Sequence, residues 1–558
     1  MKHLCTLIIP LLLGVLHLQA QNNPQANAQS PMRKLQLAEF AIANLYVDKV
    51  DEEKLVEDAI KGMLEKLDPH SAYSNAEEVK KMNEPLQGNF EGIGVQFNMV
   101  EDTLFIIQPV SGGPSEKVGI LAGDRIVTVN DTTIAGVKMS REDIMRRLRG
   151  PKGTHVKLGI SRHGFNELLT FDVTRDKIPL HTIDAAYLIR KGIGYVRISS
   201  FGATTHTEFT DAITQLKKQG MKHLILDLQG NGGGYLNAAV DIANEFLEAD
   251  ELIVYTEGLR QPRREFKAKG DGKLRTGNIV VLIDEFSASA SEIVSGAIQD
   301  WDRGQVVGRR SFGKGLVQRP LDLPDGSMIR LTTARYYTPA GRCIQKPYDD
   351  KKKYKEDLND RFKKGEFIHA DSIHFPDSLK YTTRKEGRIV YGGGGIMPDY
   401  FIPLDTTRYN KYHRDLAAKG SIINASLRYI DNHREELTSR YKNFDSFNQK
   451  FEVTPDLLQQ LVENGNKAGV KFDEALYTEA LPQLKLQMKA LIARDLWEMN
   501  EYFRIMNEEN ESVTKALDLL QKTKKSGSPA NRTSPADTRS KKNYQLMAMV
   551  LSADSSFF

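Results

Sequence analysis

The sequence predicts an α/β multidomain protein, and three observations support this. The chain has 558 residues, 27% charged and 40% hydrophobic, which are globular proportions at a length that fits about three to five domains. Near-continuous apolar strands alternate with amphipathic helices between residues 178 and 404, as in a buried sheet covered by helices. Apolar residues recur at helical spacing towards both ends. The balance of 77 basic and 73 acidic residues argues against a nucleic-acid partner.

The first twenty residues predict a secretory signal peptide. Lys2 and His3 precede the apolar run 4–18, and Ala20 provides a small residue for cleavage. An uncleaved anchor is the alternative, but the run is short for a membrane span and leads into a polar stretch. No cysteine at the cleavage site offers a lipid anchor. We therefore predict residues 1–20 as a signal peptide cleaved after Ala20, a periplasmic or secreted protein, and no stable membrane anchor.

Cysteine content narrows the chemistry further. The chain has two cysteines, Cys5 and Cys343, and cleavage of the signal peptide would leave Cys343 alone. The mature protein is therefore expected to fold without a disulfide. Cys343 also lies far along the chain from the motifs described below, which disfavours a thiol mechanism.

Changes in periodicity divide the rest of the chain. Helical spacing in the first part gives way to short alternating strands with glycine turns, then to the α/β alternation, and then to charged helical segments. The predicted domains are a helical region at 31–87, a mainly β domain at 88–175, an α/β core at 176–408 in which 347–390 is an insertion or long loop, a helical domain at 409–521, and a basic, disordered tail at 522–558.

The segment 281–293 is the most informative for chemistry. An apolar strand ends in a run of small residues that opens a helix, which would place a serine at the carboxyl edge of the sheet beside free helix N–H groups. Ser289 at this junction is a candidate nucleophile. Glu292 stands three residues later, so the alternative is a capping box in which Ser289 only caps the helix.

The segment 308–315 matches most of the phosphate-binding P-loop motif, because Gly308, Gly313 and Lys314 are correctly spaced. Gly315 occupies the place of the Ser or Thr that would hold magnesium, so that interpretation fails. A lysine flanked by glycines can instead approach a serine closely, and a desolvated lysine loses its charge and can act as a base. Ser–Lys pairs are a known variant of serine hydrolysis.

The third segment, 226–236, is a strand that enters a glycine-rich turn and then a helix. Glycines allow backbone N–H groups to face a phosphate or a developing oxyanion. A tight turn that needs positive φ is an equally good explanation of these glycines taken alone.

Together these segments resemble the carboxyl-terminal processing peptidases, the tail-specific serine proteases of bacterial envelopes and chloroplasts. The resemblance covers roughly residues 35–405, with four signatures in order: 90–94, the turn after Asp227, 287–292 and 312–318. The family's nucleophile precedes its lysine by 25 positions, which selects Ser289 with Lys314. One departure is Gln229, where most relatives carry arginine.

The resemblance implies a crotonase/ClpP-like α/β serine protease core with an inserted PDZ domain at 88–175. It also implies these site residues: Ser289, Lys314 and Gln318 for catalysis, the backbone of Ala290 and of Gly232 or Gly233 for the oxyanion hole, and Gly92, Ile93 and Gly94 for a substrate carboxylate. Asp300 matches a family position, for which we expect a structural role. No metal or cofactor is implied.

The function implied is an envelope serine endopeptidase with a Ser–Lys dyad. Its substrates would be proteins whose flexible apolar C-termini add a strand to the PDZ domain, and the helical ends would suit a homodimer. The alternative function is a catalytically silent PDZ scaffold that organises envelope proteins.

Overall fold

The computed structural model describes residues 30–100 and 102–522. The predicted signal peptide and its cleavage after Ala20, and all of the predicted tail except Lys522, lie outside the described residues. The chain divides into two compact units, with the boundary between Tyr73 and Ser74.

The first unit is helical. Helices α2 (Pro31–Leu45) and α3 (Glu52–Leu64) begin at Ser30 and Asp51, whose side chains accept the N–H groups of Arg33 and Lys54. Such caps satisfy N–H groups that a helix start leaves without partners.

The unit boundary falls inside the predicted helical region 31–87. Strand β1 (Ala72–Ser74) spans it, and helix α4 (Ala76–Gln87) belongs to the second unit. Glu84 on α4 forms an ion pair with Arg149 at 2.5 Å, which ties this helix to the β domain. Hydrophobic periodicity predicts that a segment is helical, but it does not predict which compact unit the helix packs against.

The β domain follows α4. Five antiparallel strands pair in the order β3-β4-β5-β7-β8, with β6 on β5, while β2 pairs with β9. The core is apolar and includes Ile106, Ile126 and Leu158. Its strands are β2 (Asn89–Gly92), β3 (Val95–Val100), β4 (Thr103–Pro109), β5 (Arg125–Val129), β6 (Thr132–Thr133), β7 (His155–Ser161), β8 (Leu169–Thr174) and β9 (Asp176–Pro179), and its helices are α5 (Pro114–Lys117) and α6 (Arg141–Leu148).

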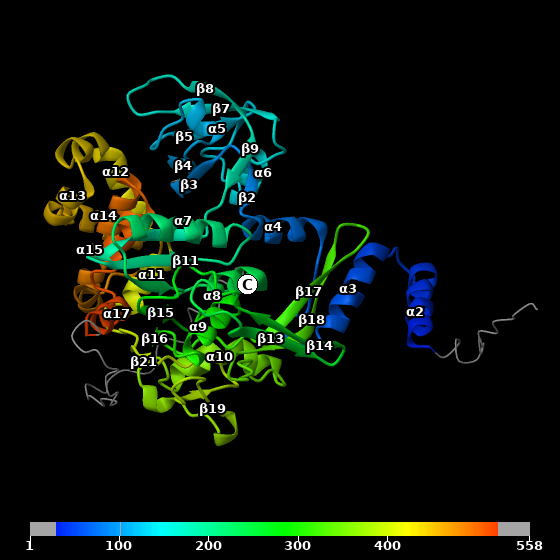
Figure 1. Ribbon diagram of the computed structural model, residues 1–558. Helices are drawn as coiled ribbons and strands as arrows, with labels where there is room; N and C mark the ends of the chain where they lie inside the picture. The colour runs from blue at the N-terminus through cyan, green and yellow to red at the C-terminus, as the bar shows by residue number, and fades with distance from the viewer. Residues whose placement is uncertain (1–29, 101, 523–558) are drawn as a thin grey trace, which may run out of the picture. The chain divides into compact units, whose positions relative to one another are not determined.

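A six-stranded sheet in the order β10-β11-β12-β15-β16-β21 forms the α/β core, parallel from β11 onwards. Helices α7, α8 and α9 cover one face (Figure 1) and share one hydrophobic cluster with it. This confirms the predicted α/β alternation. The elements are β10 (Ile183–Arg190), β11 (Ile193–Ile198), α7 (Thr205–Lys218), β12 (His223–Asp227), α8 (Leu236–Asn244), β15 (Ile279–Ile283), α9 (Ala290–Asp300), β16 (Gln305–Gly308) and β21 (Tyr400–Phe401).

A second, antiparallel sheet lies beside the segments that contain Ser289 and Lys314. Strand β18 pairs with both β17 and β13, and β13 pairs with β14. The bounds are β13 (Leu252–Gly258), β14 (Gln261–Lys267), β17 (Leu316–Asp322) and β18 (Met328–Tyr337).

The long-loop interpretation of residues 347–390 is wrong. The stretch contains helix α10 (Lys351–Lys363), two short 3-10 turns (Ala370–Ser372 and Asp377–Leu379), and strand β19 (Lys380–Thr382), which pairs with β20 (Ile389–Tyr391). On α10, Tyr354 and Arg361 are buried, and Arg361 donates to the backbone oxygens of Arg310 and Ser311. The sequence pattern did not predict this helix, because its few buried residues lie among many exposed lysines.

The C-terminal helices do not form one separate domain as predicted for 409–521. Helices α11 to α15 share a hydrophobic cluster with α16, but α17 packs on the second face of the core sheet through Val513, Ala516 and Leu520. The core therefore includes the last described helix. The bounds are α11 (Lys411–Ala418), α12 (Ser421–Arg440), α13 (Phe444–Lys450), α14 (Pro455–Lys467), α15 (Glu474–Leu496), α16 (Met499–Met506) and α17 (Glu511–Lys522).

Candidate active site

The three segments singled out in the sequence follow adjacent strands of the core sheet. The glycine turn follows β12, Ser289 follows β15, and Lys314 follows β16. Parallel strands end at the same edge, where ligands of α/β sheets typically bind. The fold therefore brings the segments together.

A cavity of about 280 Å³ lies where they meet. Its lining includes five of the six residues predicted for catalysis and the oxyanion hole: Gly232, Ser289, Ala290, Lys314 and Gln318. Apolar side chains, among them Leu236, Ile293 and Leu316, form much of the remaining wall.

Ser289 has an unusual backbone conformation, with φ 55° and ψ −110°. Non-glycine residues adopt such angles at a cost, and strained residues cluster at functional sites. Half of the capping box considered for this segment is present, because the Ser289 N–H donates to Glu292 Oε2 at 2.8 Å, whereas the Glu292 N–H donates to the backbone oxygen of Ser289 at 2.9 Å. This contact uses the backbone of Ser289, so it does not compete with a nucleophilic role for the hydroxyl.

Glu292 does more than cap the helix. Its carboxylate is fully buried and also accepts the Ser311 hydroxyl at 2.5 Å and the N–H groups of Gly313 and Lys314 at 2.8 and 2.9 Å. Burial raises the pKa of Glu292, and these hydrogen bonds oppose that rise. One carboxylate thus joins the serine segment to the lysine segment, a role that sequence spacing gave only as a cap.

Tyr336 on β18 is a second link between these segments, and sequence reasoning missed it. Its buried hydroxyl donates to the backbone oxygen of Ser289 at 3.0 Å and also contacts that of Lys314. Its own N–H donates to Gly315 O at 3.0 Å. Burial raises the pKa of this phenol well above its ordinary value.

The candidate oxyanion donors differ in availability. Among the described residues, neither Ala290 N–H nor Gly232 N–H donates to an acceptor. Gly233 N–H donates to Asn231 Oδ1 at 2.8 Å, which argues against Gly233 as a donor. Its role is close approach, since a Cβ at Gly233 would lie 2.8 Å from the Ser289 Cβ.

Gln318 lines the cavity four residues after Lys314. Its Nε2 is buried and, within the described part of the chain, has no hydrogen-bond partner. An unsatisfied amide in the cavity that holds Ser289 is suited to bind a ligand or to orient a neighbouring side chain.

In the β domain, a groove of about 330 Å³ runs between β3 and α6. Ile93 and Gly94 line it, whereas Gly92 pairs with Asp176 at the end of β2. The N–H groups of Ile93 and Gly94 donate to no acceptor in the described ranges. Two of the three residues predicted to bind a carboxylate are thus placed with free donors.

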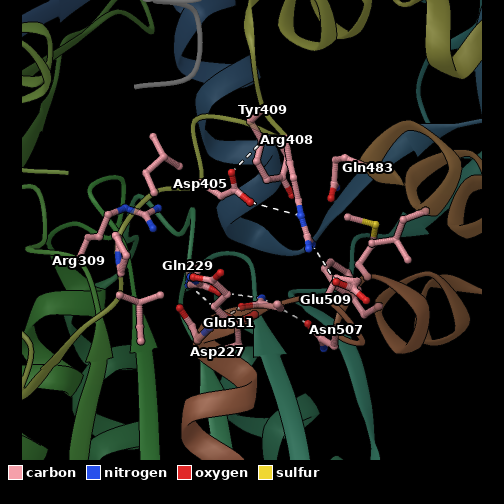
Figure 2. A pocket seen from close by; sticks show the side chains of 18 of the residues that line it. Asp227, Gln229, Arg309, Asp405, Arg408, Tyr409, Gln483, Asn507, Glu509 and Glu511 are labelled. Atoms are coloured by element: carbon pink, nitrogen blue, oxygen red, sulfur yellow. Dashed lines mark hydrogen bonds and ion pairs between the residues drawn. The ribbon is translucent and has the colours of Figure 1, made fainter. Parts of the chain in front are cut away.

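Gln229 belongs to a different cavity, of about 320 Å³. Figure 2 shows it near Asp227 and Glu511, with Arg309 and Gln483 on opposite sides of the cavity. The turn has a guanidinium nearby despite the glutamine, because Arg197 pairs with Asp227 and donates to Gln229 O, both at 2.7 Å.

Asp300 and Cys343 are two further residues named from the sequence, and both are at least partly buried. Asp300 is buried against Arg342 at 2.5 Å and accepts the Ala340 N–H, as expected of a structural residue. Cys343 is a free thiol whose pKa is raised by burial.

Two absences hold for residues 30–100 and 102–522. No helix there combines the length and apolar character needed to cross a membrane. No group of three His, Cys, Asp or Glu residues there is placed to hold a metal ion.

Comparison with protein families gives four matches along the chain. Residues 192–350 match peptidase family S41, and residues 92–174 match the PDZ domain. Residues 13–78 match the N-terminal domain of the activating protease CtpB, and residues 412–498 match a family of unknown function.

Curated relatives and a solved structure are also similar. The carboxy-terminal processing protease CtpA of Bacillus subtilis is 35% identical over 350 residues, which are 62% of this chain and 74% of that protein. A carboxy-terminal-processing protease of Bartonella bacilliformis is 37% identical over 336 residues, 58% of this chain and 76% of that protein. The solved photosystem II D1 C-terminal processing protease is 27% identical with a TM-score of 0.36, covering 69% of this chain and 90% of that one.

Proposed function

The chain belongs to the carboxy-terminal processing proteases of peptidase family S41, and from this premise we propose that Ser289 and Lys314 form its catalytic dyad. The family assignment makes the chain a serine-type endopeptidase with a PDZ domain and confirms the resemblance predicted from four motifs. One observation carries the proposal: a single cavity holds Ser289, Lys314 and Gln318 beside two unused backbone N–H groups.

The proposed reaction is acyl transfer without histidine. Ser289 Oγ bonds to the scissile carbonyl carbon while its proton passes to Lys314 Nζ. The C–N bond then breaks, and the lysine returns the proton to the leaving amine. Water hydrolyses the acyl-enzyme with Lys314 again as base. The N–H groups of Ala290 and Gly232 would bind the oxyanion, each contributing about 2.7–4 kcal/mol in the transition state.

Three residues would hold the dyad in place. Glu292 and Tyr336 bridge the serine and lysine segments by backbone hydrogen bonds, and Gln318 would orient the amine of Lys314. Such preorganisation matters because small displacements of reacting groups cost large factors in rate.

We further propose that the PDZ domain selects the substrate. An extended C-terminus would add as a strand beside β3 and place its carboxylate at the N–H groups of Ile93 and Gly94. A folded tail could not enter as a strand, so the proposed substrates are proteins with flexible apolar C-termini. The signal-like residues 1–20 support a place in the cell envelope.

Ser289→Ala tests the dyad. The variant is expected to lose digestion of an unfolded protein and labelling by a fluorophosphonate, with unchanged thermal unfolding. Ser291→Ala is the matched control, because the Ser291 hydroxyl donates to Asn231 O and should still permit labelling. Digestion by Ser289→Ala at the wild-type rate would refute the assignment. Intact activity in a chain lacking residues 1–20, with the full-length chain recovered only from the cytoplasm, would refute the envelope role.

A further inference from the structure

The charge of the active-site cavity is one-sided. Arg330 lines it together with the proposed base Lys314, and no aspartate or glutamate does. The nearby Glu292 carboxylate lies behind the wall, where four protein donors already bind it. Within the cavity, nothing balances the guanidinium of Arg330.

Arg330 reaches the cavity because of its position on β18. Side chains alternate along a strand, and Met328, Arg330 and Tyr336 all line the cavity. Arg330 lies opposite Pro320, two residues along from the position opposite Gln318. Diagonal neighbours at this spacing are within reach of a long side chain, so the guanidinium is on the same wall as the proposed catalytic amide.

Arg330 is half-buried, yet its side chain forms no hydrogen bond or ion pair with any residue in 30–100 or 102–522, and its Nε is buried. Burial alone lowers the pKa of this guanidinium, which nevertheless stays charged because arginine does not deprotonate in proteins. Other arginines of the core with little exposure are paired: the buried Arg342 with Asp300, and the half-buried Arg309 with Glu285. A partly desolvated cation without a partner is costly unless a ligand supplies the counter-charge.

We propose that Arg330 forms an anionic subsite, binding a carboxylate of the substrate beside the scissile bond. The proposal rests on the proposed function, since it assumes that the substrate passes through the Ser289 cavity. A carboxylate fits better than a neutral carbonyl because it neutralises the charge and accepts two parallel guanidinium hydrogen bonds. The apolar wall around Arg330 strengthens this attraction by excluding water.

Quenched fluorescent peptides provide the test. Pairs that differ only as Glu or Gln at one position, scanned along the peptide, are compared by kcat/KM. The wild type is expected to favour Glu at one position near the scissile bond by about tenfold, mainly through KM. Arg330→Gln should bring this ratio to about one, and Arg330→Lys should keep part of it, since lysine retains the charge but not the fork.

A second set of arms identifies the source of the carboxylate. Each peptide is made with a free and with an amidated C-terminus. If Arg330→Gln removes the preference for Glu over Gln, the carboxylate is an acidic side chain; if it removes only a preference for the free C-terminus, the carboxylate is the chain end. Arg319→Gln is the matched control, because Arg319 is exposed on the neighbouring strand β17 and should change neither ratio.

Equal ratios in wild type and Arg330→Gln for both sets would overturn the proposal. Fluorophosphonate labelling of Ser289 in the same variants separates this failure from failure of the dyad. Normal labelling with unchanged ratios counts against the subsite alone, whereas labelling and cleavage that persist in Ser289→Ala count against the proposed function.

Discussion

At the scale of single residues, the carboxylate of Glu292 connects the segments of the proposed dyad residues Ser289 and Lys314. Ser289, Ser311, Gly313 and Lys314 all donate to it. Removing a buried acceptor leaves its donors unsatisfied, at about 1–3 kcal/mol for each group. Glu292 is therefore a positioning residue that acts through the backbone of its neighbours.

Glu292→Gln is expected to lower kcat by about 10- to 100-fold, because a displaced nucleophile or base costs factors of this size. The amide NH2 would face N–H donors instead of accepting them, so the thermal midpoint should fall as well. Steady-state kinetics and thermal unfolding measure both effects. Glu265→Gln, at an exposed position of strand β14, is the control, and wild-type kcat in Glu292→Gln would contradict this role.

Tyr336 offers a cleaner separation of catalysis from folding. Tyr336→Phe keeps the ring but removes the hydroxyl that contacts the carbonyls of Ser289 and Lys314. We expect kcat to fall about tenfold or more with KM unchanged and only about 1 kcal/mol of stability lost. Tyr337→Phe is the matched control, since Tyr337 stacks on Tyr255. An equal fall in both variants would argue against a positioning role for Tyr336.

The sequence predicted those site residues that lie within recognisable motifs. Ser289, Lys314 and Gln318 follow from motifs, and all three line one cavity. Tyr336 and Arg330 could not be predicted, because their contribution depends on the pairing of β17 with β18. Their even spacing along the strand was the available signal, but spacing alone does not tell which face meets the cavity.

At the scale of elements, helices α10 and α17 show what hydrophobic periodicity does not predict. Strands β11, β12 and β15 and the covering helices of the core were predicted because each is strongly apolar or amphipathic. Helix α10 was missed because few of its residues pack, and α17 was assigned to the wrong body. An amphipathic helix reveals that it has a partner, but its sequence does not name the partner.

Leu520→Ala tests the packing of α17 on the core sheet. Leu520 is 2% exposed within the cluster that contains Ile225, Val280 and Val307. Truncating such a leucine is expected to cost about 2–5 kcal/mol, measured by denaturant unfolding of the core. Thr514→Ala, at an exposed position of the same helix, should change stability by less than about 0.5 kcal/mol. Equal stability of the two variants would show that α17 does not support the sheet.

At the scale of the whole molecule, substrate capture and peptide cleavage are assigned to different domains and should be separable. Gly94 has φ +72°, and a Cβ there would lie 2.8 Å from Ile178 and 3.2 Å from Pro114. A side chain at this position would distort the proposed carboxylate loop while leaving the Ser289 cavity unchanged.

Gly94→Val is therefore expected to slow cleavage of a protein with an apolar C-terminus by about tenfold, while fluorophosphonate labelling of Ser289 stays at the wild-type rate. Gly136→Ala is the control, since Gly136 has a similar φ of +71° but no atom near the added Cβ. A parallel loss of labelling in Gly94→Val would show that the two domains cannot be separated in this way.

The position of α17 also affects the time at which the enzyme can be completed. The face of the sheet that bears Tyr195, Ile225 and Val280 is closed by a helix that begins only at Glu511. During synthesis, this apolar face therefore lacks the cover of α17 until residues 511–522 have been made. Partly made chains that end before α17 would expose it to holding chaperones, so a protease built in this order completes its core only after its C-terminal helices have been made.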